Sequence, residues 1–337
     1  MKRILVVKLS SLGDIAHALP AVRALKERTG AEIDWLVQPE YAGLLECCPD
    51  VARAIAFPRR HPVAGAWRFW KALRREEYSA VIDLQGLLKS AVPARLARRT
   101  RRAKVFGPAW AREGAEHLYT LRPVKDAGAR RHAVLEAMDV VGLYAPAEDG
   151  DGTPPRPIIE PPEWEEDETG EEDGTAAGPR VGMAPFSRWN TKNWGVDKFA
   201  ELGARLAREM GCRIRILGGP GDVAEGRALA GRIPGARAEC GTMGLASLCG
   251  FMKGLDLLIS VDSGPMHWAD AMGVPLVAVY GATDPVRTGP WWQPEAVVTA
   301  EGLECRPCHS RVCRRGDCAC LGELSVDAVF RAAMARL

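Results

Sequence analysis

The fold is decided by the stretch LLISVDSGPMHWA at residues 257–269. Its first five residues, 257–261, are typical of a buried β-strand, and the turn Asp262-Ser263-Gly264 leads into the first turn of a helix. A helix N-terminus that offers a serine hydroxyl, backbone N–H groups and His267 suits a diphosphate. The stretch therefore predicts a strand–loop–helix unit with an anion site in its loop.

The same alternation of strands and helices runs through the rest of the chain. Apolar runs predict strands at residues 4–7, 33–37, 80–84, 180–184, 213–217 and 276–280, and helical spacing marks residues 15–25, 196–210 and 222–232. Strands that alternate with helices imply parallel sheets in doubly wound domains. We therefore predict an α/β protein with two Rossmann-like domains that face a central cleft, a common place for a small-molecule site.

Charge divides the chain in a similar way. The 337 residues carry a net charge of +2, but residues 1–147 hold 25 Lys and Arg against 15 Asp and Glu. Residues 148–179 hold one basic residue and 12 acidic ones, and residues 180–337 hold 19 basic and 16 acidic residues. We predict domains at 1–147 and 180–337, the second ending in a helix, joined by an acidic, Pro- and Gly-rich linker at 148–179 that is partly disordered. The basic first half indicates an anionic partner.

The composition excludes several classes of protein. Hydrophobic residues make up 47% and charged residues 26% of the chain, as in globular proteins and unlike collagen-like or largely disordered chains. No apolar window approaches the roughly 20 residues of a membrane span. The opening Met1-Lys2-Arg3 is not followed by the hydrophobic region of a secretory signal, so we expect a cytoplasmic protein.

Three other loops carry polar residues that follow predicted strands. In the first, Asp14 is either a helix cap or a general base held ionised by the helix dipole, and His17 lies one turn further along. The second contains Ser187, Thr191 and Lys192, which suit a phosphate. The alternative is a solvated loop above a packed Trp194, and one such loop is only a weak nucleic-acid signal. In the third, Asp222 and Glu225 follow a Gly-rich turn, where an acid suits a ribose; the alternative is a tight turn capped by Asp222.

These loops carry the motifs of a known family. The motifs are Ser10–Asp14 with His17 and Leu19-Pro20-Ala21; Asp83–Ser90; the Lys192/Trp194 loop; and Ser260–Gly264 with His267, followed by Tyr280–Pro285. In this order they resemble glycosyltransferase family nine, the lipopolysaccharide heptosyltransferases. The opening motif is more like that of heptosyltransferase I than that of heptosyltransferase II. Only the linker lies outside the resemblance.

The resemblance implies a fold and a reaction. The fold is the GT-B arrangement, and the reaction is the inverting, metal-independent transfer of L-glycero-D-manno-heptose from ADP-heptose to the Kdo of a Kdo-lipid A type acceptor. Asp14 is then the catalytic base. The implied donor-binding residues are Ser187, Thr191, Lys192, Asp222, Glu225, Asp262, Ser263, Gly264 and His267. The implied acceptor-binding residues are Ser10, Ser11, Gly13, His17, Gln85 and Lys89.

An anionic, lipid-linked acceptor gives the basic first half a partner. Arginine binds carboxylates and phosphates bidentately, and basic patches are attracted to anionic lipids. We therefore expect peripheral association with the inner leaflet of the inner membrane, no nucleic-acid partner and a monomeric enzyme. Roughly half of these basic residues are equally explained as a solvated helix face.

Five of the ten cysteines cluster in the segment 305–320. In a reducing compartment disulfides are disfavoured, so Cys305, Cys308, Cys313 and Cys318 are a candidate structural zinc or iron–sulfur site with no catalytic role. A similar Cys-x-Pro-Cys segment also occurs in the family without an obligatory metal. No cofactor is expected for catalysis.

Two other functions remain compatible with the sequence. One is a GT-B glycosyltransferase that uses a different nucleotide sugar. The other is a non-catalytic ligand- or metal-binding protein, against which the intact Asp14, Lys192, Asp262 and His267 weigh.

Overall fold

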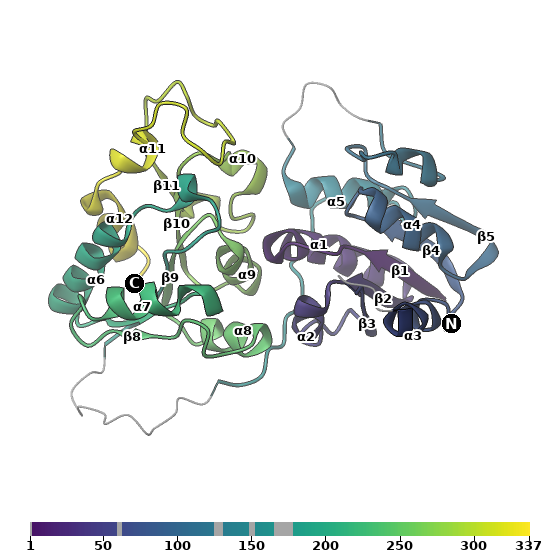
Figure 1. The fold of residues 1–337 in the computed structure, drawn as a ribbon, viewed down its shortest axis with the longest axis horizontal. Coiled ribbons are helices and arrows are strands. Elements are labelled where there is room, and N and C mark those ends of the chain that lie inside the picture. Colours follow the sequence, from purple (N-terminus) through teal and green to yellow (C-terminus); the bar gives the residue numbers. More distant parts are fainter. Residues whose placement is uncertain (1, 59–62, 125–130, 148–151, 165–177) are drawn as a thin grey trace. The chain divides into compact units, whose positions relative to one another are not determined.

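The computed structural model describes residues 2–58, 63–124, 131–147, 152–164 and 178–337. The chain forms two compact units, residues 1–160 and 161–337. Each unit has its own parallel sheet with helices packed against it (Figure 1). The α/β prediction is confirmed, and the two sheets are the Rossmann-like halves that the alternating pattern predicted.

Unit 1 holds a five-stranded sheet in the order β3-β2-β1-β4-β5. The strands are β1 (Arg3–Val7), β2 (Glu32–Val37), β3 (Arg53–Ala56), β4 (Tyr78–Asp83) and β5 (Arg99–Phe106). The helices are α1 (Leu12–Thr29), α2 (Ala42–Leu45), α3 (Val63–Leu73), α4 (Leu88–Leu96) and α5 (Ala133–Gly142). Strand β1 is central because residues 4–7 are fully buried and pair with β2 on one side and β4 on the other.

Unit 2 holds a six-stranded parallel sheet in the order β11-β10-β9-β6-β7-β8. The strands are β6 (Arg180–Ala184), β7 (Arg213–Ile216), β8 (Arg237–Ala238), β9 (Leu257–Val261), β10 (Leu276–Tyr280) and β11 (Val297–Thr299). The helices are α6 (Val196–Met210), α7 (Val223–Ala230), α8 (Leu245–Lys253), α9 (Gly264–Met272), α10 (Pro285–Thr288), α11 (Ala319–Gly322) and α12 (Val326–Met334). The short strands β8 and β11 were not predicted because each has only two or three residues.

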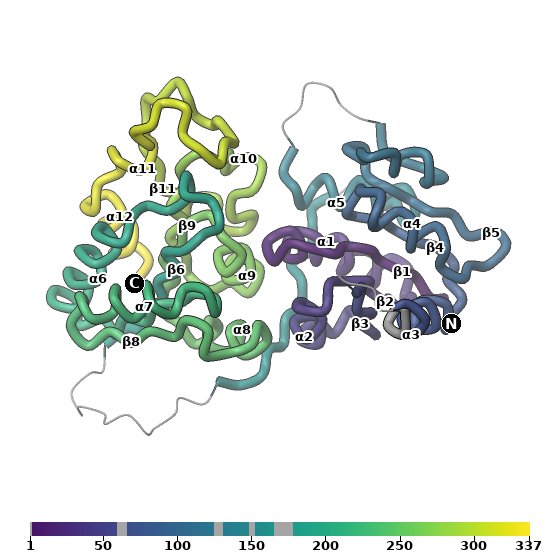
Figure 2. The backbone as a smooth tube through the Cα atoms, in the orientation of Figure 1, coloured from purple at the N-terminus to yellow at the C-terminus, as the bar shows by residue number. Residues whose placement is uncertain are grey.

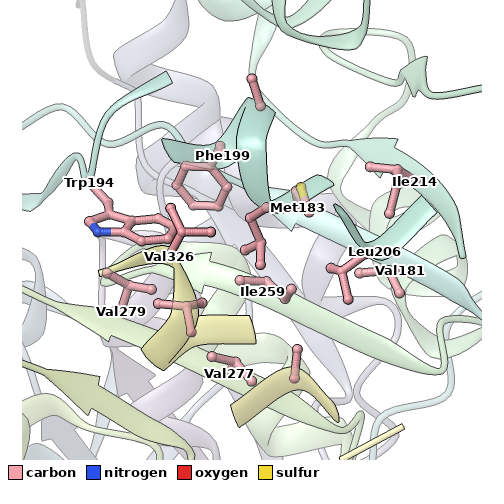
Figure 3. Packing of buried hydrophobic residues seen from close by; sticks show 14 of the residues in the cluster. Val181, Met183, Trp194, Phe199, Leu206, Ile214, Ile259, Val277, Val279 and Val326 are labelled. Carbon is pink, nitrogen blue, oxygen red and sulfur yellow. The ribbon is translucent and has the colours of Figure 1, made fainter. Parts of the chain in front are cut away.

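The core of unit 2 joins segments from both ends of that unit. Val181 and Met183 of β6 pack with Phe199 of α6 and Val326 of α12 in one buried cluster (Figure 3). Helices α6 and α12 lie side by side (Figure 2). Trp194, which precedes α6, donates its indole N–H to the carbonyl oxygen of Leu324 at 3.0 Å. The predicted terminal helix therefore completes the core of unit 2.

Part of the predicted linker is ordered. The N–H of Glu160 donates to the carbonyl oxygen of Cys47 at 2.7 Å, so the chain at residue 160 is held against unit 1. Trp164 packs edge-on against Phe251, with their ring centroids 5.3 Å apart, inside unit 2. The boundary between the units falls within the segment 148–179. Residues 148–151 and 165–177, where the predicted disorder falls in part, lie outside the described residues.

Within the described ranges, none of the helices combines the length and the apolar character that crossing a bilayer requires.

The buried indole of Trp194 provides a test of this core. Replacing Trp194 with Phe removes the hydrogen bond to Leu324 and leaves a cavity, so we expect the free energy of unfolding to fall by about 2 kcal/mol. Urea denaturation measures the change. The matched control is Trp67→Phe on α3, where the side chain is 64% exposed and the change should stay within about 0.5 kcal/mol. Equal effects at both positions would contradict the assignment of Trp194 to the core.

Candidate active site

The first polar cluster lies where β1 and β4 of unit 1 end. Lys8 follows β1, is almost fully buried and donates from Nζ to the carbonyl oxygen of Leu84 at 2.9 Å. Gln85 follows β4, and its Oε1 accepts from the N–H groups of Leu9 at 3.0 Å and Ser10 at 3.2 Å. Adjacent parallel strands thus bring two loops 76 residues apart in sequence into one hydrogen-bonded surface.

Asp14 stands at the edge of this cluster, in the first turn of α1. Its Oδ2 accepts from the N–H of Ser11 at 2.8 Å and from the hydroxyl of Ser11 at 2.6 Å. Its Oδ1 lies 3.9 Å from Nζ of Lys8, and half of the side chain is exposed. These contacts fix the carboxylate next to a buried cation while leaving it accessible, which a general base for an incoming hydroxyl requires.

The buried carboxylate of Asp83 stabilises the loop that carries Gln85. Oδ1 of Asp83 accepts from the N–H groups of Gln85 at 2.8 Å and Gly86 at 3.2 Å, and its Oδ2 accepts from the Tyr119 hydroxyl at 2.7 Å. Burial raises the pKa of Asp83, and these hydrogen bonds oppose that rise. Asp83 therefore positions Gln85 and is not itself exposed for reaction.

The other predicted acceptor residues are placed differently. Ser10 and Ser11 are half-buried in the same loop as Asp14, and Gly13 is buried. His17 is buried and packs edge-on against His132, with 5.4 Å between the ring centroids. Lys89 is exposed on α4. Ser10, Ser11, Asp14 and Gln85 thus form one surface, whereas His17 belongs to the packing between α1 and α5.

The second cluster centres on Asp262, at the end of β9 in unit 2. Its side chain is 3% exposed, and its Oδ2 lies 2.7 Å from Nζ of Lys192. The hydroxyl of Thr283 also donates to Oδ2, at 2.5 Å, and Nε2 of His267 lies 3.6 Å from Oδ1. Three loops that the sequence singled out separately therefore meet at one carboxylate.

The electrostatics of Asp262 follow from these neighbours. Burial alone would raise its pKa, but the interactions with His267 and Lys192 lower the pKa to about 2. A buried carboxylate is retained in its ionised form only when it is paired in this way. The cluster therefore presents cationic and hydrogen-bonding groups held in place by a fixed negative charge.

The helix that follows Asp262 supplies backbone donors. Ser263 is the N-cap of α9, and Gly264 is its first residue. The Ser263 hydroxyl lies 3.2 Å from that of Ser260. First-turn N–H groups lack partners within their own helix, so the N-terminus of α9 adds a favourable site for an anion beside Lys192 and His267.

The loop that carries Lys192 is held in place by neighbouring segments. The Ser187 hydroxyl accepts from the N–H of Trp189 at 3.3 Å, and Nζ of Lys192 lies 4.9 Å from the centre of the Trp189 ring. The Thr191 side chain is buried and donates to the carbonyl oxygen of Ser310 at 2.6 Å. In this structure Ser187 and Thr191 therefore stabilise the loop, and their predicted phosphate contacts stay predictions.

The two alternatives for a nucleoside contact remain distinct. Asp222 accepts from the N–H of Gly219 at 2.7 Å, which closes the turn after β7. Glu225 is exposed in the first turn of α7. The Asp222 carboxylate thus stabilises the turn through the backbone of Gly219, whereas the Glu225 side chain is exposed to solvent.

The Cys-rich segment 305–320 packs against the loops that carry Thr191 and Thr283. Arg306 donates from Nε to the carbonyl oxygen of Gly281 at 2.7 Å, and the N–H groups of Cys308 and His309 donate to that of Ala282 at 3.1 and 2.9 Å. Together with the bond from Thr191 to Ser310, these contacts join the loops that bear Lys192 and Thr283. The segment thus braces the Asp262 cluster.

The structure gives no support to the predicted metal site at Cys305, Cys308, Cys313 and Cys318. The cysteines line a small pocket with Arg306 and Asp317. Among the described residues, no group of three or more His, Cys, Asp or Glu side chains is arranged to hold a metal ion. Structural zinc sites are closed tetrahedra, whereas Cys305 and Cys308 are exposed and the Arg315 guanidinium interacts with Cys305.

The sequence did not identify two residues that contact Asp14 and Asp262 in the structure, namely Lys8 and Thr283. Lys8 was not selected because a lysine after a short strand reads as a solvated residue, although its position at the buried end of β1 was a usable signal. Thr283 lies within a motif that was recognised, but only the fold reveals that its hydroxyl reaches Asp262.

Comparison with known proteins now assigns the chain to a family. The model of glycosyltransferase family 9 (heptosyltransferase) matches residues 66–319. The chain belongs to this family. It is a glycosyltransferase, as the resemblance of its motifs predicted, and the segment matched contains the whole Asp262 cluster as well as Gln85.

Relatives that match along most of the chain are heptosyltransferases. The chain is 30% identical over 325 residues to lipopolysaccharide heptosyltransferase 1 of Pseudomonas aeruginosa, covering 92% of this chain and 87% of that protein. Its fold matches Escherichia coli heptosyltransferase WaaC with ADP, with a TM-score of 0.76 and 25% identity over 99% of this chain and all of that one. WaaC with ADP-2-deoxy-2-fluoro heptose matches at a TM-score of 0.73, with the same identity and coverage. These matches confirm the predicted GT-B type of fold.

The depressed pKa of Asp262 predicts how stability depends on pH. Because the carboxylate titrates at about 2 in the folded protein and at about 3.9 in an unfolded chain, its pairing contributes stability above about pH 4. This contribution is lost as the pH falls toward 2. The difference in free energy of unfolding between wild type and Asp262→Asn should therefore shrink by about 2 kcal/mol between about pH 4 and pH 2.

Denaturant unfolding at a series of pH values measures this difference. The control is Asp197→Asn, where the carboxylate is 91% exposed and pairs with Arg232 at the surface; an exposed pair contributes little, so the difference from wild type should stay within about 0.5 kcal/mol throughout. A constant difference for Asp262→Asn would refute the pairing described above.

Proposed function

We propose that this glycosyltransferase transfers L-glycero-D-manno-heptose from ADP-heptose to the Kdo of a Kdo-lipid A type acceptor, as a heptosyltransferase I-like enzyme. The observation that carries the proposal is the Asp262 cluster. It joins Lys192, His267 and the N-terminus of α9 in a fold that matches a heptosyltransferase bound to ADP and to an ADP-heptose analogue. A diphosphate fits this combination of a cation, a histidine and backbone donors.

The proposed roles follow from the chemistry of a single in-line displacement. Asp14 accepts the proton of the acceptor hydroxyl as its oxygen bonds to the anomeric carbon. The bond from that carbon to the phosphate oxygen breaks, and ADP leaves with the bonding electron pair, so the configuration inverts. Lys192, His267, Ser263 and Gly264 stabilise the charge that develops on the diphosphate, and Asp262 contacts the heptose. Asp14 belongs to unit 1, and the residues proposed to contact the donor belong to unit 2.

Lys192 has a partner before any donor binds. Its ammonium group is paired with Asp262 at 2.7 Å, so an incoming diphosphate meets a cation already fixed in position rather than a mobile side chain. Such preorganisation is the main source of electrostatic stabilisation in a transition state. Asp262 keeps the lysine near the phosphates and, in this proposal, turns its other oxygen toward the sugar.

We also propose that catalysis needs no metal, and that the enzyme acts as a monomer at the cytoplasmic face of the inner membrane. Lys192 and the helix N-terminus supply the positive potential that a metal would otherwise provide. The basic first half of the chain supports attraction to an anionic lipid surface.

The role of Asp14 as the base has a direct test. Asp14→Asn keeps the size of the side chain but cannot accept the proton, so we expect the turnover number for heptosyl transfer to fall roughly 10²–10⁴-fold. Binding of ADP-heptose, measured by calorimetry, should change less than about twofold, since the donor contacts lie in unit 2. Asp139→Asn on α5 is the matched control. Near-normal turnover by Asp14→Asn would remove it as the base.

Metal removal tests a separate part of the proposal. Treatment with EDTA, followed by elemental analysis, should leave the transfer rate within about 20% of that of untreated enzyme, because the charge stabilisation comes from protein groups. Loss of activity that returns when Mg²⁺ or Zn²⁺ is added back would refute metal independence.

A further inference from the structure

Helix α4 of unit 1 exposes a line of large apolar side chains. Leu88, Val92 and Leu96 recur every four residues and are 44%, 38% and 51% exposed. Residues four apart on a helix lie on one face, so the three side chains form a continuous stripe. Single exposed apolar residues are normal on a protein surface, but a row along one helix indicates an interaction surface.

The opposite side of α4 is the one that holds the helix to the sheet. Ala91 and Ala94 are fully buried, and Ala94 shares a core cluster with Leu5 and Val7 of β1. The helix thus buries its small residues and turns its large ones toward solvent, the reverse of an ordinary amphipathic helix. The core of unit 1 does not require this arrangement.

Exposed basic side chains lie on α4 and on the strand that follows it. Lys89 and Arg95 are exposed on α4 itself. The next element is β5, the edge strand of the sheet, and it exposes Arg101, Arg102 and Lys104. Three acidic residues lie on neighbouring segments: Glu113 accepts from the N–H of Leu88 at 3.4 Å, Glu116 lies on the 3-10 turn 115–118 that packs against α4, and Glu77 lies 4.0 Å from Arg98. The surroundings of the stripe are therefore cationic.

Helix α3 extends this surface on the same side of the sheet. Phe69 and Leu73 of α3 belong to the same core cluster as Ala94 of α4, so both helices cover one face of the sheet. The outer side of α3 exposes Trp67 by 64%, and Nζ of Lys71 lies 5.0 Å from the centre of its ring. Tryptophan side chains are enriched at membrane–water interfaces.

We propose that the outer face of α3 and α4 docks this enzyme onto an anionic lipid bilayer. Leu88, Val92 and Leu96 lie at the boundary of the acyl chains, Trp67 lies at the headgroup level, and the basic residues of α4 and β5 contact anionic headgroups. This combination of apolar stripe, aromatic residue and cations is the chemistry of an interfacial helix.

The inference rests on the proposed function in one respect, which is that the acceptor is a lipid. Leu88 follows Gln85 by three residues, and Gln85 bonds to the backbone of the Asp14 loop. Docking through α4 therefore sets the proposed acceptor surface next to the bilayer that holds the acceptor, within unit 1 alone.

Vesicle sedimentation tests the docking surface. The full chain is mixed with phosphatidylcholine vesicles with or without 30% phosphatidylglycerol. We expect binding to the anionic vesicles only, weakening as salt is raised. The triple variant Leu88→Gln, Val92→Gln, Leu96→Gln keeps good helix formers and should bind at least roughly tenfold more weakly.

Two further variants control the experiment. Leu143→Gln, Ile158→Gln, Leu337→Gln removes three apolar side chains of similar exposure elsewhere and should bind like wild type. Arg101→Gln, Arg102→Gln, Lys104→Gln leaves α4 untouched and should reduce both the binding and its dependence on salt. Far-UV circular dichroism checks that each variant is folded.

Transfer assays separate the docking from the proposed reaction. The α4 triple variant should transfer heptose normally to an acceptor dispersed in detergent, but at least roughly tenfold more slowly to one embedded in vesicles. If no heptosyl transfer is seen while the vesicle binding follows the expected pattern, the docking stands and the proposed function fails.

Other results would overturn the docking. These are no binding of wild type to anionic vesicles, equal binding by the α4 variant and wild type, and a dimer in sedimentation velocity that the α4 variant abolishes. The last result would mean that a second copy of the chain covers this face.

Discussion

Parallel strand pairing is the constraint on which both polar clusters depend. In a parallel sheet all strands point the same way, so the loops after neighbouring strands emerge at one edge. Lys8 and Gln85 meet because β1 pairs with β4. Asp262 meets Lys192 and Thr283 because β9 lies between β6 and β10. Strand pairing alone thus makes neighbours of residues up to about 90 positions apart in the sequence.

Buried polar groups then decide which residues can stand at that edge. Asp83 and Asp262 are both buried carboxylates, and each is tolerated because hydrogen bonds or cations surround it. Their uses differ. Asp83 accepts hydrogen bonds from the backbone of the Gln85 loop and from the Tyr119 hydroxyl, so it stabilises the conformation of that loop. Asp262 is paired with charged side chains, so it holds a cationic site in place.

The sequence predicts the fold and much of the site for identifiable reasons. The apolar runs at 4–7 and 257–261 bury completely, so hydrophobicity alone locates these central strands. Asp262, His267 and Lys192 could be singled out because each follows such a run. The use of Thr191 could not be predicted, because its hydroxyl bonds to Ser310, a residue 119 positions away. Cysteine spacing likewise did not determine which thiols face one another. The apolar stripe of α4 is invisible in the sequence, where residues four apart read as core.

The packing of α12 into the core of unit 2 has a consequence for how the chain is made. Unit 1 is built from one continuous segment, so it can finish folding while the remainder is still being translated. Unit 2 cannot finish folding early, because Phe199 packs against Val326 and the indole of Trp194 bonds to the carbonyl oxygen of Leu324, near the end of the unit. Its sheet therefore remains without part of its cover until α12 has been translated.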